Sequence, residues 1–236
     1  MAQKTNPIGL RLGLTQVWDL ALQNYGGKNK FYSNFILKQI TLNNFLQYYL
    51  YSKASNFIDK AYVELDYKNI VLRLSYTAKE LAVNAQQLNF DERKVKEKLE
   101  TIHICKTRIE IFHNYNFFIT ANLVAFYVKS LCEQKFSLKS IMLNLENFLK
   151  DNLDATKIVV LKNGVSVITF KGFRLRISGR FENTRNGMAK SYEQSYGSLS
   201  LIRLKNYVEF CSQPIFTKLG TCTFQVCLFY EIKDAN

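Results

Sequence analysis

The sequence predicts an α+β fold with two domains and an extended N-terminal arm. Apolar residues recur at helical spacing in several segments before residue 150, whereas after Asp151 they alternate with a period of two. A half rich in helices followed by a half rich in strands is typical of α+β proteins. We therefore expect an arm over residues 1–34, a first α/β domain over 35–150 and a strand-rich α+β domain over 151–236.

The first half combines helical repeats with one hairpin pattern. Residues 1–34 show little periodicity, which predicts an extended arm. Thr41 suits an N-cap, and the apolar residues after it recur at helical spacing. The further elements expected here are a hairpin over Tyr62–Tyr76, a charged helix with a solvated face from Asp91, a strand over Arg108–His113, and helices over Ala121–Glu133 and from Ser137 to Leu149.

The second half is predicted to be a series of strands. Asn163-Gly164 lies between two alternating segments and is a typical two-residue hairpin turn. In Phe173–Ile177 the alternation places the apolar residues on one face and Arg174 and Arg176 on the other. The strands expected are Ile158–Leu161, Val165–Phe170, Phe173–Ile177, Leu199–Phe210 and Cys222–Ile232.

The charge of the chain favours an anionic partner. It has 32 Lys and Arg residues against 19 Asp and Glu, a formal net charge of +13. A basic domain without a charge-dependent role remains the plain alternative, but the excess is large for the length. A membrane surface would suit the charge equally, yet no apolar run approaches the roughly 18 residues of a spanning helix. Nucleic acid is therefore the preferred partner class, and no membrane is expected.

Neither a metal nor a cofactor is expected. Five cysteines form no C-x-x-C pair, and His103 and His113 lie near only Cys105, whereas a structural zinc site needs four closely spaced soft ligands. No P-loop, dinucleotide fingerprint or nucleophile motif is present, so we expect no enzyme. The odd cysteine count, with no signal-peptide pattern, fits a reducing compartment in which the thiols are small core residues.

Two segments carry a resemblance to a known family. The first segment, Ala2–Gly13, is similar to the pattern G-Q-K-x-N-P-x-G-x-R-L-G, and Trp18 matches the tryptophan that follows this pattern. The second segment is similar to the pattern K-G-x-x-x-x-x-S-G-R, through Lys171-Gly172 and Ser178-Gly179-Arg180. Both patterns occur in the universal small-subunit ribosomal protein three family, in this order and near this separation. Gly197–Phe210 and Leu219–Leu228 resemble its later strands. The resemblance covers residues 1–19 and 171–230 well and 36–150 loosely.

The resemblance implies an N-terminal type II KH domain, but this chain departs from that pattern. A KH domain clamps a nucleic-acid backbone with a G-x-x-G loop, because glycine lets the main chain come close. Between Gly27 and Gly164 this chain has no glycine. We therefore expect a degenerate KH-like domain that serves as scaffold. The basic helix that faces the mRNA entrance in bacterial members is reduced here to Lys135 and Lys139.

Basic residues near glycines are the candidate RNA contacts. Without the resemblance, the arginines of Phe173–Ile177 would be an ordinary solvated strand face and the N-terminus a disordered basic tail. With it, phosphate binding is favoured, since arginine presents a rigid fork of donors. Trp18 is expected to anchor the arm. The candidate ribosomal-RNA contacts are Lys4, Arg11, Lys171, Arg174, Arg176, Arg180, Arg185, Lys190, Arg203 and Lys205, and those on the mRNA-entrance side are Lys135 and Lys139.

The function implied by the resemblance is that of a structural, RNA-binding constituent of the small ribosomal subunit. Its place would be the subunit head near the mRNA entrance, with ribosomal RNA, neighbouring head proteins and, transiently and weakly, mRNA as partners. Phenylalanine (18) and tyrosine (14) are abundant, whereas proline (2) and glycine (10) are scarce, which resembles the bias of an A/T-rich coding genome such as that of an organelle. The expected location is a mitochondrion, ahead of a plastid or a bacterial cytoplasm. The alternatives are a free-standing basic RNA-binding protein and a nucleic-acid-processing enzyme.

Overall fold

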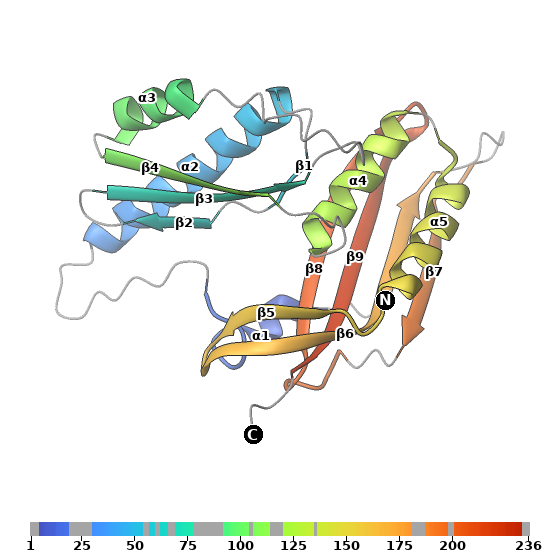
Figure 1. Ribbon diagram of the computed structural model, residues 1–236. Coiled ribbons are helices and arrows are strands. Elements are labelled where there is room, and N and C mark those ends of the chain that lie inside the picture. Colours follow the sequence, from blue (N-terminus) through green and yellow to red (C-terminus); the bar gives the residue numbers. More distant parts are fainter. Residues whose placement is uncertain are drawn as a thin grey trace. The chain divides into compact units, whose positions relative to one another are not determined.

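The computed structural model describes residues 5–18, 30–53, 57–59, 62–65, 69–77, 92–103, 106–113, 120–134, 136–180, 187–197 and 201–232. The chain forms two compact units. Unit 1 comprises Met1–Trp18 with Phe117–Asn236, and unit 2 comprises Asp19–Asn116. Each unit combines helices with a β-sheet (Figure 1). The predicted α+β class is confirmed.

The sheet of unit 1 has strand order β5-β6-β9-β8, and β7 also pairs with β6. All these pairs are antiparallel. The strands are β5 (Thr156–Leu161), β6 (Gly164–Gly179), β7 (Lys190–Gly197), β8 (Tyr207–Thr217) and β9 (Gly220–Ile232). β6 joins two strands that we expected to be separate, and its register against β9 shifts between Phe170 and Gly172. The irregularity explains why Phe170 and Phe173 both face the core.

Two helices of unit 1 cover one face of this sheet, α4 (Ala121–Glu133) and α5 (Leu138–Asp151) (Figure 1). Thr120 and Ser137 cap them through their side chains. Glu209 of β8 ties α4 to the sheet, because its carboxylate accepts from the Ala121 amide at 3.1 Å and from Lys157 Nζ of β5 at 2.7 Å. The shared core is built from Val124, Val128, Ile141, Leu145, Phe173, Leu175, Ile177, Phe224, Val226 and Leu228.

The division of the chain differs from the domain boundary expected near residue 151. That expectation rested on the change from helical to alternating periodicity. The apolar stripes of α4 and α5 are buried against the sheet that follows them, so the change marks a switch of element inside one unit. A stripe shows that a helix face is buried without showing which sheet buries it.

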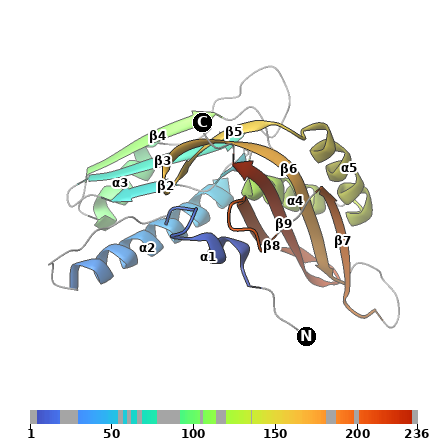
Figure 2. The same ribbon diagram turned by 90° about the horizontal axis from the view of Figure 1, so that it is seen from below.

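The N-terminal segment, residues 5–18, is folded onto unit 1 rather than extended as expected. Pro7–Arg11 forms the short helix α1, with Asn6 as N-cap and proline at the helix start. α1 lies beside β8 (Figure 2). Gln16 bridges to Leu161 of β5, and its buried side chain donates to the Val208 carbonyl at 2.8 Å. Five helical residues are too few for periodicity to reveal.

Unit 2 is a small α/β unit. β3 pairs with β1 and β2 antiparallel and with β4 parallel, and α3 lies between β3 and β4 in sequence. The elements are α2 (Lys30–Lys53), β1 (Phe57–Ile58), β2 (Tyr62–Leu65), β3 (Asn69–Thr77), α3 (Glu92–His103) and β4 (Lys106–His113). Its buried apolar side chains are Leu42, Ile70, Leu72, Leu74, Val95 and Leu99. The hairpin, the charged helix and the strand expected there are confirmed.

Helix α2 begins earlier than expected. We placed an N-cap at Thr41, but the helix starts at Lys30, and the Thr41 hydroxyl donates to the Lys38 carbonyl one turn back. The helix therefore runs into the stretch that the sequence assigned to the arm. Among the described helices of both units, none is long and apolar enough to cross a bilayer.

Candidate nucleic-acid interface

The alternation predicted for β6 is confirmed and creates a basic strand face. Phe173, Leu175 and Ile177 are at most 1% exposed in the core. Arg174, Arg176 and Ser178 lie on the opposite side of the strand, which we call the arginine face. Its neighbours in register include Gln225 and Thr223 of β9. The face is polar toward the end of β6, whereas Arg174 lies opposite Cys227, which belongs to a small apolar cluster with Val208 and Phe229.

Arg174 is not a free cation. Its Nε donates to the Glu193 carboxylate of β7 at 2.6 Å, and this hydrogen bond raises the pKa of the guanidinium. The sequence prediction missed this partner, because the strands expected from the sequence did not include residues 190–197. A phosphate that binds Arg174 has to share it with Glu193 or displace that carboxylate.

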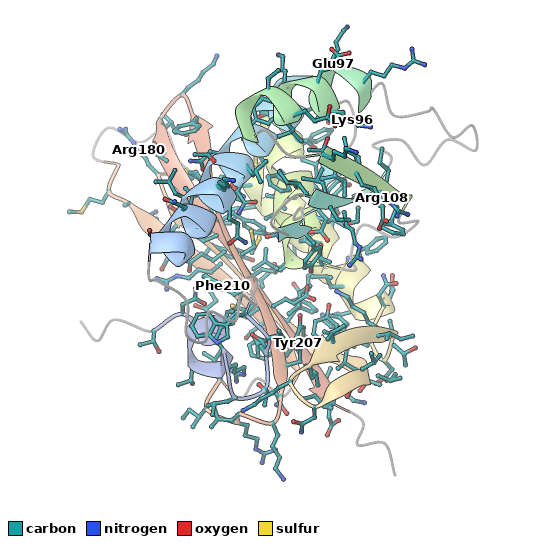
Figure 3. All side chains as sticks on the ribbon, turned by 90° about the vertical axis from the view of Figure 1, so that its left-hand side faces the viewer. Lys96, Glu97, Arg108, Arg180, Tyr207 and Phe210 are labelled. Atoms are coloured by element: carbon teal, nitrogen blue, oxygen red, sulfur yellow. The ribbon has the colours of Figure 1, made fainter. Side chains whose placement is uncertain are left out.

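Arg176 and Arg180 continue the arginine face toward the end of β6. The Nε atom of Arg176 is buried and has no hydrogen-bond partner among the described residues. Arg180 packs over Gly187, where a Cβ atom would come within 2.5 Å of its Nε. Arg180 and Tyr207 mark opposite ends of this sheet in Figure 3. Gly187 thus makes room for a guanidinium.

Lys171 and Lys190 lie at the margins of the same sheet. Lys171 is exposed at the irregularity of β6, and its Nζ contacts Asp154 at 2.6 Å. This hydrogen bond raises the pKa of the lysine, but an exposed pair of this kind contributes little to stability. Lys190 opens β7, opposite Gly179, and is exposed. Both lysines are accessible to an anion.

Arg203 and Lys205 do not alternate on a strand as expected. β8 begins only at Tyr207, and residues 201–206 form a turn-rich loop, which we call the 201–206 loop. Both side chains are exposed on it. Leu201 of the loop packs against a small cluster that contains Val208 and Phe229.

Arg11 is fully buried, so its expected role as an RNA contact is wrong in this structure. Its exposed fraction is 0%, and its guanidinium donates to backbone carbonyls of α1 and the 201–206 loop. Burial lowers its pKa. An external phosphate cannot reach a side chain that is closed off in this way. Its partners in the 201–206 loop lie 190 or more residues away in sequence, so no local pattern could have revealed them.

The remaining candidates divide by whether the structure describes them. Lys4, Arg185 and Lys135 lie outside the described residues. Lys139 is exposed in the first turn of α5. Trp18, expected as an anchor, leaves 61% of its side chain exposed, although its indole nitrogen lies close to Gly13.

The described residues offer no group of His, Cys, Asp and Glu side chains suited to a metal ion. Cys211, Cys222 and Cys227 are buried and form no disulfide among the described residues. Burial raises the pKa of the Cys227 thiol to about 11. These cysteines pack as small core residues, in line with the prediction.

Comparison with known proteins gives a consistent result. The chain is 39% identical over 236 residues to small ribosomal subunit protein uS3m of Chondrus crispus, covering 99% of this chain and 95% of the relative. It is 26% identical to uS3 of Fervidobacterium nodosum, covering 97% of each chain. With uS3 of Phytoplasma mali it shares 29% identity over 98% of this chain and 85% of the relative. No family model matches the chain.

Proposed function

Because the chain belongs to the uS3 family of small ribosomal subunit proteins, in its organellar form, we propose that it is a structural constituent of the small subunit of a mitochondrial ribosome. It binds ribosomal RNA there and supports translation. The single observation that carries this function is the 39% identity to a uS3m protein along nearly the whole of both chains. The net charge of +13 agrees with an RNA partner.

The proposed RNA-binding surface is the arginine face of unit 1 and its margins. Arg174, Arg176 and Arg180 form its centre, and the exposed 201–206 loop contributes further cations. Arg11 is removed from the set because it is buried. The proposed contacts are Lys171, Arg174, Arg176, Arg180, Lys190, Arg203 and Lys205, with Lys4 and Arg185 kept as proposals from the sequence.

Unit 2 is proposed to be the degenerate KH-like domain. Its support is a small sheet in which β3 and β4 pair in parallel, together with a sequence that offers no G-x-x-G loop. Without glycine, Cβ atoms hold an RNA backbone away from the main-chain N–H groups. We therefore assign unit 2 a scaffold role.

The proposed place of the protein is the head of the subunit near the mRNA entrance. Its neighbours there are other head proteins, its contact with mRNA is weak and transient, and it acts without catalysis and apart from a membrane. Lys139 and Lys135 are the cations assigned to the entrance side. With so few charges, few counterions are released on binding, which is the physical reason for a weak mRNA contact.

Co-sedimentation tests the function. A tagged copy of the full chain is expressed in the source mitochondria, and lysates are separated on gradients at high salt. We expect stoichiometric retention with small subunits. Release into the free fractions would favour the alternative, a basic RNA-binding protein outside the ribosome, and RNA turnover by the purified protein would favour an enzyme.

A further inference from the structure

One buried arginine joins the N-terminal segment of unit 1 to its 201–206 loop. Arg11 lies at the end of α1, and its Nε donates to the Asn206 carbonyl at 2.9 Å. Its Nη2 donates to the carbonyls of Leu201 at 2.8 Å and Arg203 at 2.9 Å. Its Nη1 donates to the Pro7 carbonyl at 2.9 Å, which fixes the side chain to its own helix. Three carbonyls of the 201–206 loop thus converge on one guanidinium.

The contact has the character of a structural clamp. A buried charge is costly unless its donors are satisfied, and here every partner among the described residues is a backbone carbonyl. Arginine alone presents several donors in a rigid planar fork; lysine cannot reproduce that geometry. Without the guanidinium, the loop carbonyls would need other donors, and the loop would lose its common anchor.

The 201–206 loop carries two exposed cations beside the residues that Arg11 holds. The Arg203 carbonyl accepts a hydrogen bond from Arg11, while the Arg203 side chain is exposed. Lys205 directly precedes Asn206, whose carbonyl also accepts from Arg11. Gln16 attaches the same N-terminal segment to β8 separately, through the Val208 carbonyl. The N-terminal segment therefore reaches the loop through Arg11 and the sheet through Gln16.

We infer that Arg11 is a positioning residue for RNA binding: it holds the 201–206 loop so that Arg203 and Lys205 face the RNA as a fixed pair. The inference rests on the proposed function. A loop held in one conformation loses less entropy when it binds, so its phosphate contacts contribute more to affinity. Arg11 itself touches no RNA.

A double-mutant cycle on the full chain tests this role. Arg11→Met removes the fork, and Arg203→Gln with Lys205→Gln removes the loop cations. Binding to deproteinised small-subunit RNA from the source mitochondria is measured at several salt concentrations. In the wild-type background the loop variant should lower the salt slope by about two, one for each phosphate contact. In the Arg11→Met background it should lower the slope by less than half as much.

Equal losses in both backgrounds would overturn the inference, as would unchanged affinity in Arg11→Met. Gln16→Ala is the matched control, because it removes another side-chain hydrogen bond between the same segment and unit 1 without touching the 201–206 loop; the loop cations should keep their full effect in it. Arg11→Lys replaces Arg11→Met in the cycle if the latter does not fold, with the same expectation. If the wild-type protein does not bind this RNA, the proposed function is wrong. If it binds the RNA but the effects of the Arg11 and loop substitutions are additive, only the positioning role of Arg11 is wrong.

Limited trypsin digestion gives a local readout. The bonds after Arg203 and Lys205 are exposed cleavage sites within the clamped loop. We expect cleavage there to accelerate in Arg11→Met, relative to cleavage after the exposed Lys218 in the turn between β8 and β9, at the opposite end of β8 from this loop. A uniform acceleration at all sites would show general unfolding and would contradict a role specific to the loop.

Discussion

Unit 1 and unit 2 both carry many cations, but they present them differently. In unit 1, Arg174 and Arg176 lie on the same face of the central strand β6. Among the described residues, one carboxylate, that of Glu193, pairs with Arg174. In unit 2 one carboxylate, Glu110, binds both Arg73 and Arg108 at 3.1 and 3.0 Å. The cations of α3, such as Lys96, alternate with acidic residues, such as Glu97 (Figure 3). The arrangement of charge, beyond its amount, is the reason why we propose unit 1 as the RNA-binding unit.

The largest effect should come from the centre of the arginine face. Changing Arg174, Arg176 and Arg180 together to Gln removes up to three phosphate contacts, each of which releases about one counterion. We expect the salt slope of RNA binding to fall by about two to three. The measurement is a salt titration of affinity with circular dichroism as the folding control. An unchanged slope in a folded variant would show that RNA binds elsewhere.

The next effect concerns the strand geometry that supports this face. Gly197 ends β7 with φ 88°, and a Cβ there would clash with the Lys171 carbonyl oxygen. Gly197→Ala should lower the free energy of unfolding by about 1–3 kcal/mol, through strain and a backbone clash. Gly220→Ala is the matched control, because its φ is 127° and its Cβ would meet open space. If Gly197→Ala and Gly220→Ala lower the free energy of unfolding in urea equally, the effect comes from the positive φ alone and the backbone clash contributes nothing.

Glu193 offers a smaller test of opposite sign. Glu193→Gln removes the carboxylate that competes with phosphate for Arg174, so RNA affinity should rise by a few-fold, with a salt slope higher by about one. Glu110→Gln makes the same change in unit 2 and should leave affinity almost unchanged. A similar gain in both variants would mean that only net charge matters, and the distinction between the units would be lost.

The smallest effect is expected in unit 2 and on α5. Arg93→Gln with Lys96→Gln on α3, or Lys139→Ala on α5, should change RNA affinity by less than about threefold, since isolated exposed charges contribute little. Fluorescence anisotropy with single-stranded RNA would measure this. A tenfold loss in the α3 variant would show that unit 2 has an RNA-binding surface without a glycine clamp.

Sequence reasoning succeeded where periodicity reflects burial. The faces of β6, the helices α4 and α5 and the hairpin of β2 and β3 follow directly from apolar spacing. β7 was missed because nearly all its side chains are exposed, so backbone pairing with β6 defines it without an apolar pattern. α1 was missed because it has only five residues.

The candidate site was predicted in part for a related reason. Residue type and strand alternation identify Arg174 and Arg176, since both signals are local. The burial of Arg11 depends on carbonyls from the other end of the chain, and the pairing of Arg174 depends on the unexpected β7. Contacts between distant segments depend on topology, which one sequence without the fold does not show.

Cross-linking within intact small subunits tests the central claim most directly. Subunits that contain the protein are irradiated with ultraviolet light, and RNA-linked peptides are identified by mass spectrometry. We predict links concentrated in peptides from β6 around residues 171–180 and from the 201–206 loop, with few from α3 and β4. Links mainly to α3 and β4, with the arginine face unlinked, would contradict the assignment of RNA binding to unit 1.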